Sequence, residues 1–295
     1  MNICEGAERF LEHLQANGCS PHTVRSYRCD LGRLRDYLDG GQASVSALRP
    51  ETLATFLNSP FARTGPTGKV RGPGAVNRER IVLRSFGRWL WQAGHLRSNP
   101  AAGLRARALP QSPPRVLSPD DEKRLLDALR GSSAPLAFRD RVMVEVLLAT
   151  GMRASELVNL QVPDVDLAAR TAWLTAKGGA RQARHLRRTV VSLLKCYLKW
   201  RAGVVNGSQA LFVSAAGAPI CVRQFQRRLG QWLDEAGVNG RVTAHTFRHT
   251  LATRLLALTG NLRLVQQALG HRNIASTIRY TLVPNAQLAA ALEAV

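Results

Sequence analysis

The chain has 295 residues, of which 41 are Lys or Arg and 20 are Asp or Glu, so its formal net charge is +21. Hydrophobic residues make up 45% of it, which excludes a disordered chain, and the length is enough for two globular domains. A balance this basic predicts a polyanionic partner, and nucleic acid is favoured over a membrane surface. Codon bias explains why 36 Arg accompany 5 Lys, but it does not explain the shortage of acids.

The cysteines and the N-terminus indicate where the protein works. The five cysteines form no Cys-x-x-Cys pair, which is typical of reduced thiols in a cytosolic protein. The start, MNICEGAERF, has neither the apolar run nor the cleavage site of a signal peptide. No stretch approaches the roughly 20 apolar residues of a membrane span. We therefore expect a soluble protein of the cytoplasm.

The segment LRARALPQSPPRVLSP (104–119), with four prolines, is typical of an extended linker. It predicts an N-terminal domain over 1–108, a linker over 109–117 and a C-terminal domain over 118–295. Divided after residue 110, the first part carries 16 basic and 8 acidic residues and the second 25 and 12, so the net charges are +8 and +13. Two basic domains on a short tether suggest a clamp around a nucleic-acid duplex.

The N-terminal part has the pattern of a wholly helical domain. Ser20 followed by Pro21 is a typical cap and first turn, and Gly18 and Gly40 are typical ends. A Gly/Pro-rich loop is expected over 63–74. The amphipathic segments predict helices over 7–18, 20–40, 50–58 and 74–94.

The last of these helices carries Arg78, Arg80, Arg84 and Arg88. Arginines spaced at four line one helical face, as in a helix laid against phosphates or in a groove. An ordinary solvated face is the alternative interpretation.

The C-terminal part mixes helices with one hairpin. The segments TAWLTA (171–176) and RHLRRTVV (184–191) alternate as strands do, and the turn KGGAR between them puts Lys177 at the tip. The fold class is therefore mostly α: an N-terminal helical domain of the four-helix kind and a C-terminal mixed α/β domain, mainly helical with a small sheet. Its helices are expected over 118–131, 139–151, 190–202, 222–236, 243–258, 261–269 and 273–281.

The stretch AHTFRHT (244–250) places His245, Arg248 and His249 on one helical face. The two histidines have a metal-ligand spacing, but no Glu follows the first and a cation lies inside the motif, which opposes a divalent ion. Asp164 and Asp166 could hold magnesium, although an exposed turn is the better interpretation. The sequence has neither a Walker A loop nor G-x-G-x-x-G, so no metal and no cofactor are expected.

Phosphate chemistry without a metal needs cations on the non-bridging oxygens, a nucleophile and a proton donor. In ATGMRASEL, Arg153 follows a glycine at the start of a helix, where amide groups also favour an anion. Arg248 supplies a second guanidinium, and two planar guanidinium groups can neutralise a phosphoryl group. His245 can shuttle a proton there.

Three segments, ATGMRASEL, AHTFRHTLATRLL and VQQALGHRNIASTIRYTLV, together resemble the tyrosine recombinase (phage integrase) family. In order and spacing they match its Arg…Lys…His-x-x-Arg…His…Tyr pattern. The resemblance covers nearly the whole chain, since SPHTVRSYRCDL and LRSFGRWLWQAGHLRSNPAAGLRA are similar to the Xer branch. It implies a core-binding, SAM-like N-terminal domain and a catalytic C-terminal domain.

The resemblance also implies roles for particular residues. Arg153 and Arg248 would hold the phosphate, and Tyr280 would be the nucleophile that forms a 3′-phosphotyrosyl link and releases a 5′-hydroxyl. His245 and His271 would assist proton transfer and bind the phosphate.

Lys177 would be the general acid for the leaving 5′-oxygen. A proton donor must be able to release its proton, which Lys can do when its pKa is lowered and Arg effectively cannot. His249 is expected to be structural, and Glu156, one turn beyond Arg153, is expected to orient that arginine.

The implied function is site-specific DNA recombination without ATP or metal, of the Xer kind that resolves chromosome or plasmid dimers. The alternative is an integrase or resolvase of a phage, plasmid or transposon with the same chemistry. A DNA-binding regulator without catalysis and a metal-dependent nuclease are competitors from other classes.

The expected partners are double-stranded DNA with a specific site and, by resemblance, a homo- or hetero-tetramer of recombinases. The apolar tail NAQLAAALEAV (285–295) would link these subunits. A partner recombinase or a septal DNA translocase would also fit the resemblance.

Overall fold

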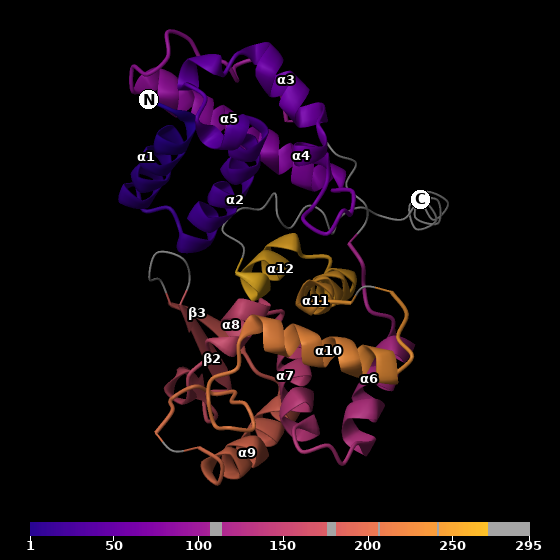
Figure 1. Ribbon diagram of the computed structural model, residues 1–295. Coiled ribbons are helices and arrows are strands. Elements are labelled where there is room, and N and C mark those ends of the chain that lie inside the picture. Colours follow the sequence, from indigo (N-terminus) through magenta and orange to yellow (C-terminus); the bar gives the residue numbers. More distant parts are fainter. Residues whose placement is uncertain (107–113, 176–180, 206, 241, 271–295) are drawn as a thin grey trace, which may run out of the picture. The chain divides into compact units, whose positions relative to one another are not determined.

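The computed structural model describes residues 1–106, 114–175, 181–205, 207–240 and 242–270. The chain divides into two compact units, Met1–Gln111 and Ser112–Val295. Among the described residues there are twelve α-helices and one three-stranded sheet, and the sheet belongs to the second unit (Figure 1). The mostly α fold class predicted from the sequence is confirmed. None of the helices described is both long enough and apolar enough to cross a membrane.

Five helices build the first unit, and sequence signals explain where they begin. The Asn2 side chain accepts a hydrogen bond from the Glu5 N–H at 2.8 Å, so the first helix starts earlier than its apolar pattern predicts. Ser20 caps the second helix in the same way, with proline directly after it. The short fourth helix was not expected. The helices are α1 (Ile3–Ala16), α2 (Pro21–Tyr37), α3 (Pro50–Asn58), α4 (Pro60–Arg63) and α5 (Pro73–Gln92).

Two buried carboxylates lie in the first unit, between α2 and α5. Asp30 accepts hydrogen bonds from Arg78 at 2.9 Å and from Arg33, and Glu79 accepts from Arg33 at 3.2 Å and from Arg71. Neither carboxylate is exposed by more than 1%. The cluster therefore ties α2, α5 and the preceding loop together through charge-assisted hydrogen bonds.

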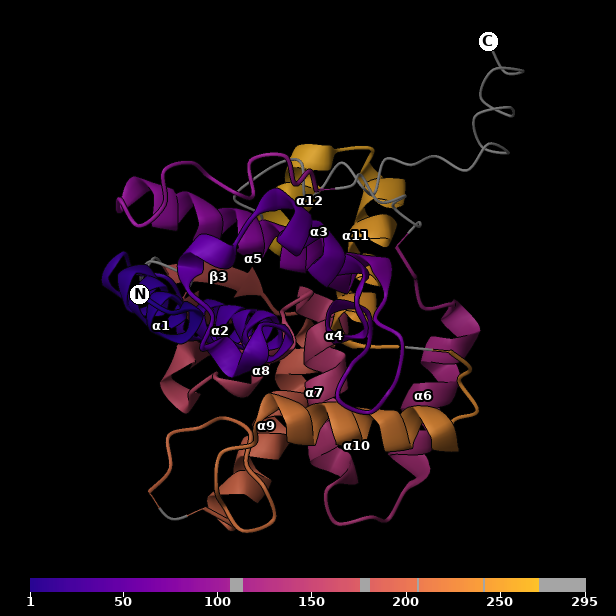
Figure 2. The ribbon, with the colours of Figure 1, turned by 45° about the horizontal axis from the view of Figure 1, so that its top comes forward.

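The second unit has seven described helices, and one of them is central and largely buried. That central helix, α7, is buried along most of its length and packs against α6, α9, α10 and α11, so its apolar residues form the core of the unit. In both views α10 runs alongside α6 and α7 (Figures 1 and 2). The helices are α6 (Pro119–Gly131), α7 (Ala137–Thr150), α8 (Ala154–Val158), α9 (Arg188–Ala202), α10 (Val222–Glu235), α11 (Ala244–Thr259) and α12 (Leu262–Leu269).

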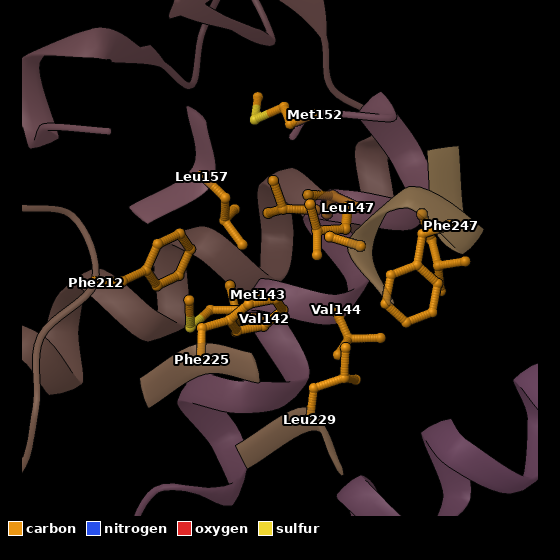
Figure 3. Packing of buried hydrophobic residues seen from close by; sticks show 14 of the residues in the cluster. Val142, Met143, Val144, Leu147, Met152, Leu157, Phe212, Phe225, Leu229 and Phe247 are labelled. Atoms are coloured by element: carbon orange, nitrogen blue, oxygen red, sulfur yellow. The ribbon is translucent and has the colours of Figure 1, made fainter. Parts of the chain in front are cut away.

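The core shows how closely these helices pack. Figure 3 shows Phe225 of α10 beside Met143 and Leu229 beside Val144 of α7, with Phe247 of α11 on the other side. All five side chains are at most 3% exposed. Such packing fixes the end of α7, shortly after which Arg153 follows, and the start of α11, which carries Arg248.

The sheet corrects one prediction. Strands β1 (Val165–Asp166), β2 (Thr171–Thr175) and β3 (Arg181–His185) are antiparallel in the order β1-β2-β3, with Trp173 opposite Ala183. The first strand of the hairpin was predicted correctly, and the short β1 was missed. The prediction of a second strand over 184–191 is wrong, because the described strand begins at Arg181 and α9 begins at Arg188. The buried residues Val190 and Leu194 are four residues apart, as on one face of a helix. This part of the segment is therefore helical, although its first residues alternate as a strand does.

Candidate active site

The corner between α7 and α8 presents Arg153. Gly151 ends α7 in the left-handed conformation, with φ of 60°, and the chain then turns so that Arg153 is the N-cap residue of α8. Its N–H donates to Glu156 Oε2 at 2.8 Å, and its Nη1 donates to Oε1 of the same carboxylate at 2.5 Å. The Arg153 side chain is 46% exposed. Glu156 therefore orients an arginine that remains open to solvent.

Arg248 points inward from the first turns of α11. It is 3% exposed, and its guanidinium donates to the carbonyl oxygen of Gly151 at 2.7 Å and to that of Leu269 at 2.8 Å. One side chain thus joins the end of α7 to the end of α12. Because both acceptors are main-chain oxygens, the guanidinium has a fixed position and its charge is not cancelled by these two bonds.

The two histidines of α11 lie next to each other on the helix surface. The rings of His245 and His249 are 6.4 Å apart between centroids, with an angle of 30° between their planes, and the spacing of four predicts that they are neighbours. His245 is exposed and His249 is half-buried. The imidazole of His245 therefore lies at the surface, three residues before Arg248 on the same helix.

A third arginine, Arg184 of β3, was not singled out from the sequence. It is 3% exposed, and its Nη2 donates to the Leu269 carbonyl at 2.9 Å and to Gln182 Oε1 at 3.1 Å. Burial lowers its pKa, while the charge of Glu156 raises that pKa and the charge of Arg153 lowers it. Arg184 thus shares an acceptor with Arg248 and lies within electrostatic range of Arg153, so three guanidinium groups gather here.

The structure brings Arg153, His245 and Arg248 to one region of the second unit, while the other predicted site residues lie outside the described residues. These are Lys177, His271 and Tyr280. The described chain ends at Gly270, which closes α12 in the left-handed conformation with φ of 63°. Leu269, the acceptor shared by two arginines, therefore lies two positions before His271.

The aspartates considered for magnesium have other partners. Asp164 accepts from the Gln161 N–H at 2.9 Å and pairs with Arg181 at 3.5 Å, and Asp166 accepts from the Ala169 N–H at 2.7 Å. These contacts agree with a turn. Within the part of the chain that the structure describes, no three His, Cys, Asp or Glu side chains are grouped as metal ligands would be.

The arginines of α5 divide into two kinds. Arg84 and Arg88 line a shallow hollow of about 240 Å³ together with Tyr27, Ile81 and Ser85. Arg78, which was grouped with them, instead pairs with the buried Asp30 at 2.9 Å. Arg78 is out of step with the spacing of four, so it turns toward α2 rather than along the row.

An apolar groove of about 690 Å³ lies in the second unit between the end of α7, the sheet, α11 and α12. Leu258 on its rim is 82% exposed and Leu264 is 40% exposed. Exposed leucines next to an apolar hollow are typical of a surface that another chain segment covers.

Family comparisons match both units. Residues 115–286 match the model of the phage integrase family. Residues 7–94 match the model of the phage integrase N-terminal SAM-like domain.

Similar proteins cover almost the whole chain. Tyrosine recombinase XerC of Salmonella typhi is 37% identical over 287 residues, which are 97% of this chain and 93% of that protein. The XerH site-specific recombinase in a post-cleavage complex with a palindromic difH substrate has a TM-score of 0.73 at 21% identity, over 94% of this chain and 81% of that one. A lambda integrase dimer bound to a core site has a TM-score of 0.74 at 19% identity, over 95% of each chain. These last two share the fold.

Proposed function

The chain belongs to the phage integrase family, and on that premise we propose that it is a site-specific recombinase of the Xer kind, which cuts and rejoins double-stranded DNA. The observation that carries this function is the similarity to XerC along 97% of the chain. Arg153 and Arg248 support it, because two guanidinium groups held at one corner of the second unit form a cationic site suited to a phosphodiester. An integrase of a mobile element is not favoured, since the similarity to XerC is nearly end to end.

The proposed reaction uses the side chains in sequence. Arg153 and Arg248 hold the non-bridging oxygens of the scissile phosphate, and the phenol oxygen of Tyr280 attacks phosphorus. A 3′-phosphotyrosyl ester forms while the bond to the 5′-oxygen breaks. His245 and His271 assist removal of the phenol proton, and Lys177 gives a proton to the leaving 5′-oxygen. The fixed Arg248 supports this scheme because a preorganised cation needs no rearrangement as charge develops.

The proposed intermediate also explains how the strands are rejoined. A phosphotyrosyl ester conserves the energy of the phosphodiester, so the exchange requires neither ATP nor a metal ion. The free 5′-hydroxyl of the partner strand attacks the ester and restores the DNA. Resolution of chromosome or plasmid dimers is the biological role that we propose for it.

The proposed assembly is a clamp of the two basic units on DNA, with four subunits on two duplexes. The tail 285–295 would dock on a neighbouring subunit, and the groove beside Leu258 is an apolar surface suited to an apolar segment. A second recombinase or a septal DNA translocase is a further proposed partner.

Removing residues 285–295 should leave DNA binding intact and weaken synapsis, because the tail would contact protein rather than DNA. Native gels with two labelled duplexes measure both. Leu258→Ser should have the same effect, whereas Val70→Ser, which alters an equally exposed apolar residue of the first unit, should not. Unaltered recombination by the truncated protein would contradict the proposed assembly.

Covalent trapping tests the proposed function. Genomic fragments from the source organism are incubated with the protein in EDTA, denatured, and the DNA bound to protein is sequenced. We expect one recovered site, and a nicked duplex of that site should then trap the wild type and Tyr37→Phe but not Tyr280→Phe. An adduct from Tyr280→Phe would mean that another residue is the nucleophile. DNA binding without any adduct would favour a regulator, and cleavage that requires a divalent ion would favour a nuclease.

A further inference from the structure

Arg184 is a buried cation that the proposed reaction does not use. Its side chain is 3% exposed, and its donors reach only neutral oxygens among the described residues: Ala183 O at 3.1 Å, Gln182 Oε1 at 3.1 Å and Leu269 O at 2.9 Å. Its Nε is buried and has no hydrogen-bond partner in the described part of the chain. A guanidinium has five N–H groups, so its donor capacity exceeds these contacts.

The charge of Arg184 is not balanced by a carboxylate within the described residues. The nearest acid to influence it is Glu156, but that carboxylate already accepts two hydrogen bonds from Arg153. A buried charge is costly unless an opposite charge faces it, so an arginine in this position favours the arrival of an anion. Desolvation strengthens the attraction, because the local dielectric constant is lower than that of water.

The second observation is geometric. Arg184 and Arg248 donate to the same carbonyl oxygen, that of Leu269, from β3 and from α11. The backbone of Gly270 lies so close that a Cβ there would collide with Arg184 Nη2 and Gln182 Oε1. Arg184 therefore fixes the end of α12 and determines where Arg248, which shares that acceptor, can lie.

We propose that Arg184 is a third arginine of the phosphate site: a positioning residue that holds the Leu269–Gly270 turn together with Arg248 and adds a buried positive charge which the scissile phosphodiester neutralises. The inference rests on the proposed recombinase function. Arg184 of β3 would then stabilise the scissile phosphate electrostatically together with Arg153 and Arg248.

The test compares a charged and an uncharged scissile group in nicked duplexes of the recovered site. One duplex carries a normal phosphodiester and the other a methylphosphonate. In the methylphosphonate a methyl group replaces one non-bridging oxygen, so the group has no negative charge. On the phosphodiester, Arg184→Met should form the covalent adduct about tenfold or more slowly than the wild type. On the methylphosphonate the two proteins should differ by less than about threefold, because there is less charge to stabilise.

Arg188→Met is the matched control, since it removes the same formal charge from an exposed residue four positions away, and its rate should stay within about twofold of the wild type. Equal defects of Arg184→Met on both duplexes would overturn the proposal and leave a structural role alone.

Thermal melting reports whether Arg184→Met folds. If it does not, Arg184→Lys carries the test, because it keeps the charge: it should retain the preference of the wild type for the phosphodiester, and loss of that preference would contradict the proposal. Failure of the wild type to form an adduct would instead count against the proposed function.

Discussion

Two glycines in the second unit end helices with almost the same backbone angle, yet their surroundings differ. Gly151 has φ of 60° and Gly260 has φ of 61°. A Cβ on Gly151 would lie 2.7 Å from Leu269 Cδ2, whereas nothing lies within 4 Å of one on Gly260. The first glycine is therefore required for packing as well as for its conformation.

Replacing either glycine with alanine tests this difference. Gly260→Ala should lower the free energy of unfolding by about 1 kcal/mol, the cost of a left-handed alanine. Gly151→Ala should cost about 2 to 4 kcal/mol, because the collision with Leu269 adds to that strain. Chemical denaturation measures both. Equal losses would show that Leu269 moves aside freely.

The buried Tyr197 should make the second unit less stable at alkaline pH. Burial raises its pKa to about 12 from 10.0, and its hydroxyl donates to the Leu211 carbonyl at 3.1 Å. The folded protein keeps this proton while the unfolded chain releases it near pH 10, so the contribution to stability is complete below that pH and is lost as the pH rises to about 12. Between about pH 9.5 and 11.5, the wild type should lose about 2 kcal/mol more than Tyr197→Phe in the free energy of unfolding. Parallel curves for the two proteins would contradict this account.

Two of the three site arginines could be predicted from local sequence patterns, and the third could not. Arg153 could be placed at a helix start because a glycine precedes it and Glu156 follows at the spacing of a capping box. The neighbourhood of His245 and Arg248 followed from helical spacing. Arg184 could not be found in this way, since an arginine in an alternating stretch is normally taken as solvent-exposed, and its burial depends on α12, 85 residues away along the chain.

Secondary structure was predictable where caps and a single period agree. Ser20 and Ser118 cap the helices that follow them, and each is followed by proline, so both starts were found within a residue. The second hairpin strand was misplaced because the period changes from two to four within RHLRRTVV. The pairing of Asp30 and Glu79 with arginines joins separate elements, and no local pattern predicts which charges meet.

The carboxylate cluster between α2 and α5 should dominate the electrostatic stability of the first unit. Asp30→Asn removes the charge that faces Arg78 and Arg33 in a buried setting, so we expect a loss of about 3 kcal/mol in the free energy of unfolding. Asp36→Asn on the same helix breaks the exposed pair with Arg35 and should cost less than about 1 kcal/mol. A loss of similar size in both variants would show that the cluster is no stronger than a surface pair.

At the scale of the whole molecule, the charge of +21 predicts DNA binding that depends steeply on salt. If about six or more phosphates are contacted, affinity should fall about a thousandfold or more between roughly 50 and 200 mM salt. Fluorescence anisotropy of a labelled duplex of the recovered site measures the slope of log K against log salt.

The same experiment tests whether Arg84 and Arg88 of α5 contact DNA phosphates. Replacing Arg84 and Arg88 with Gln should reduce the slope by about two, as expected for two lost phosphate contacts. Replacing Arg124 and Arg130 of α6, whose partners are Asp121 and Asp127, removes the same charge and should leave the slope nearly unchanged. Equal changes in the two double variants would indicate that net charge alone acts.

The main-chain anchoring of Arg248 has a consequence for how this protein can evolve. Its acceptors are the carbonyl oxygens of Gly151 and Leu269, and no substitution at position 269 can delete an oxygen of the backbone. The side chain at position 269 can therefore change while the main-chain oxygen that accepts from the guanidinium is kept. The hydrogen bond at position 269 is therefore harder to lose by substitution than the one that orients Arg153, which depends on a replaceable carboxylate, Glu156.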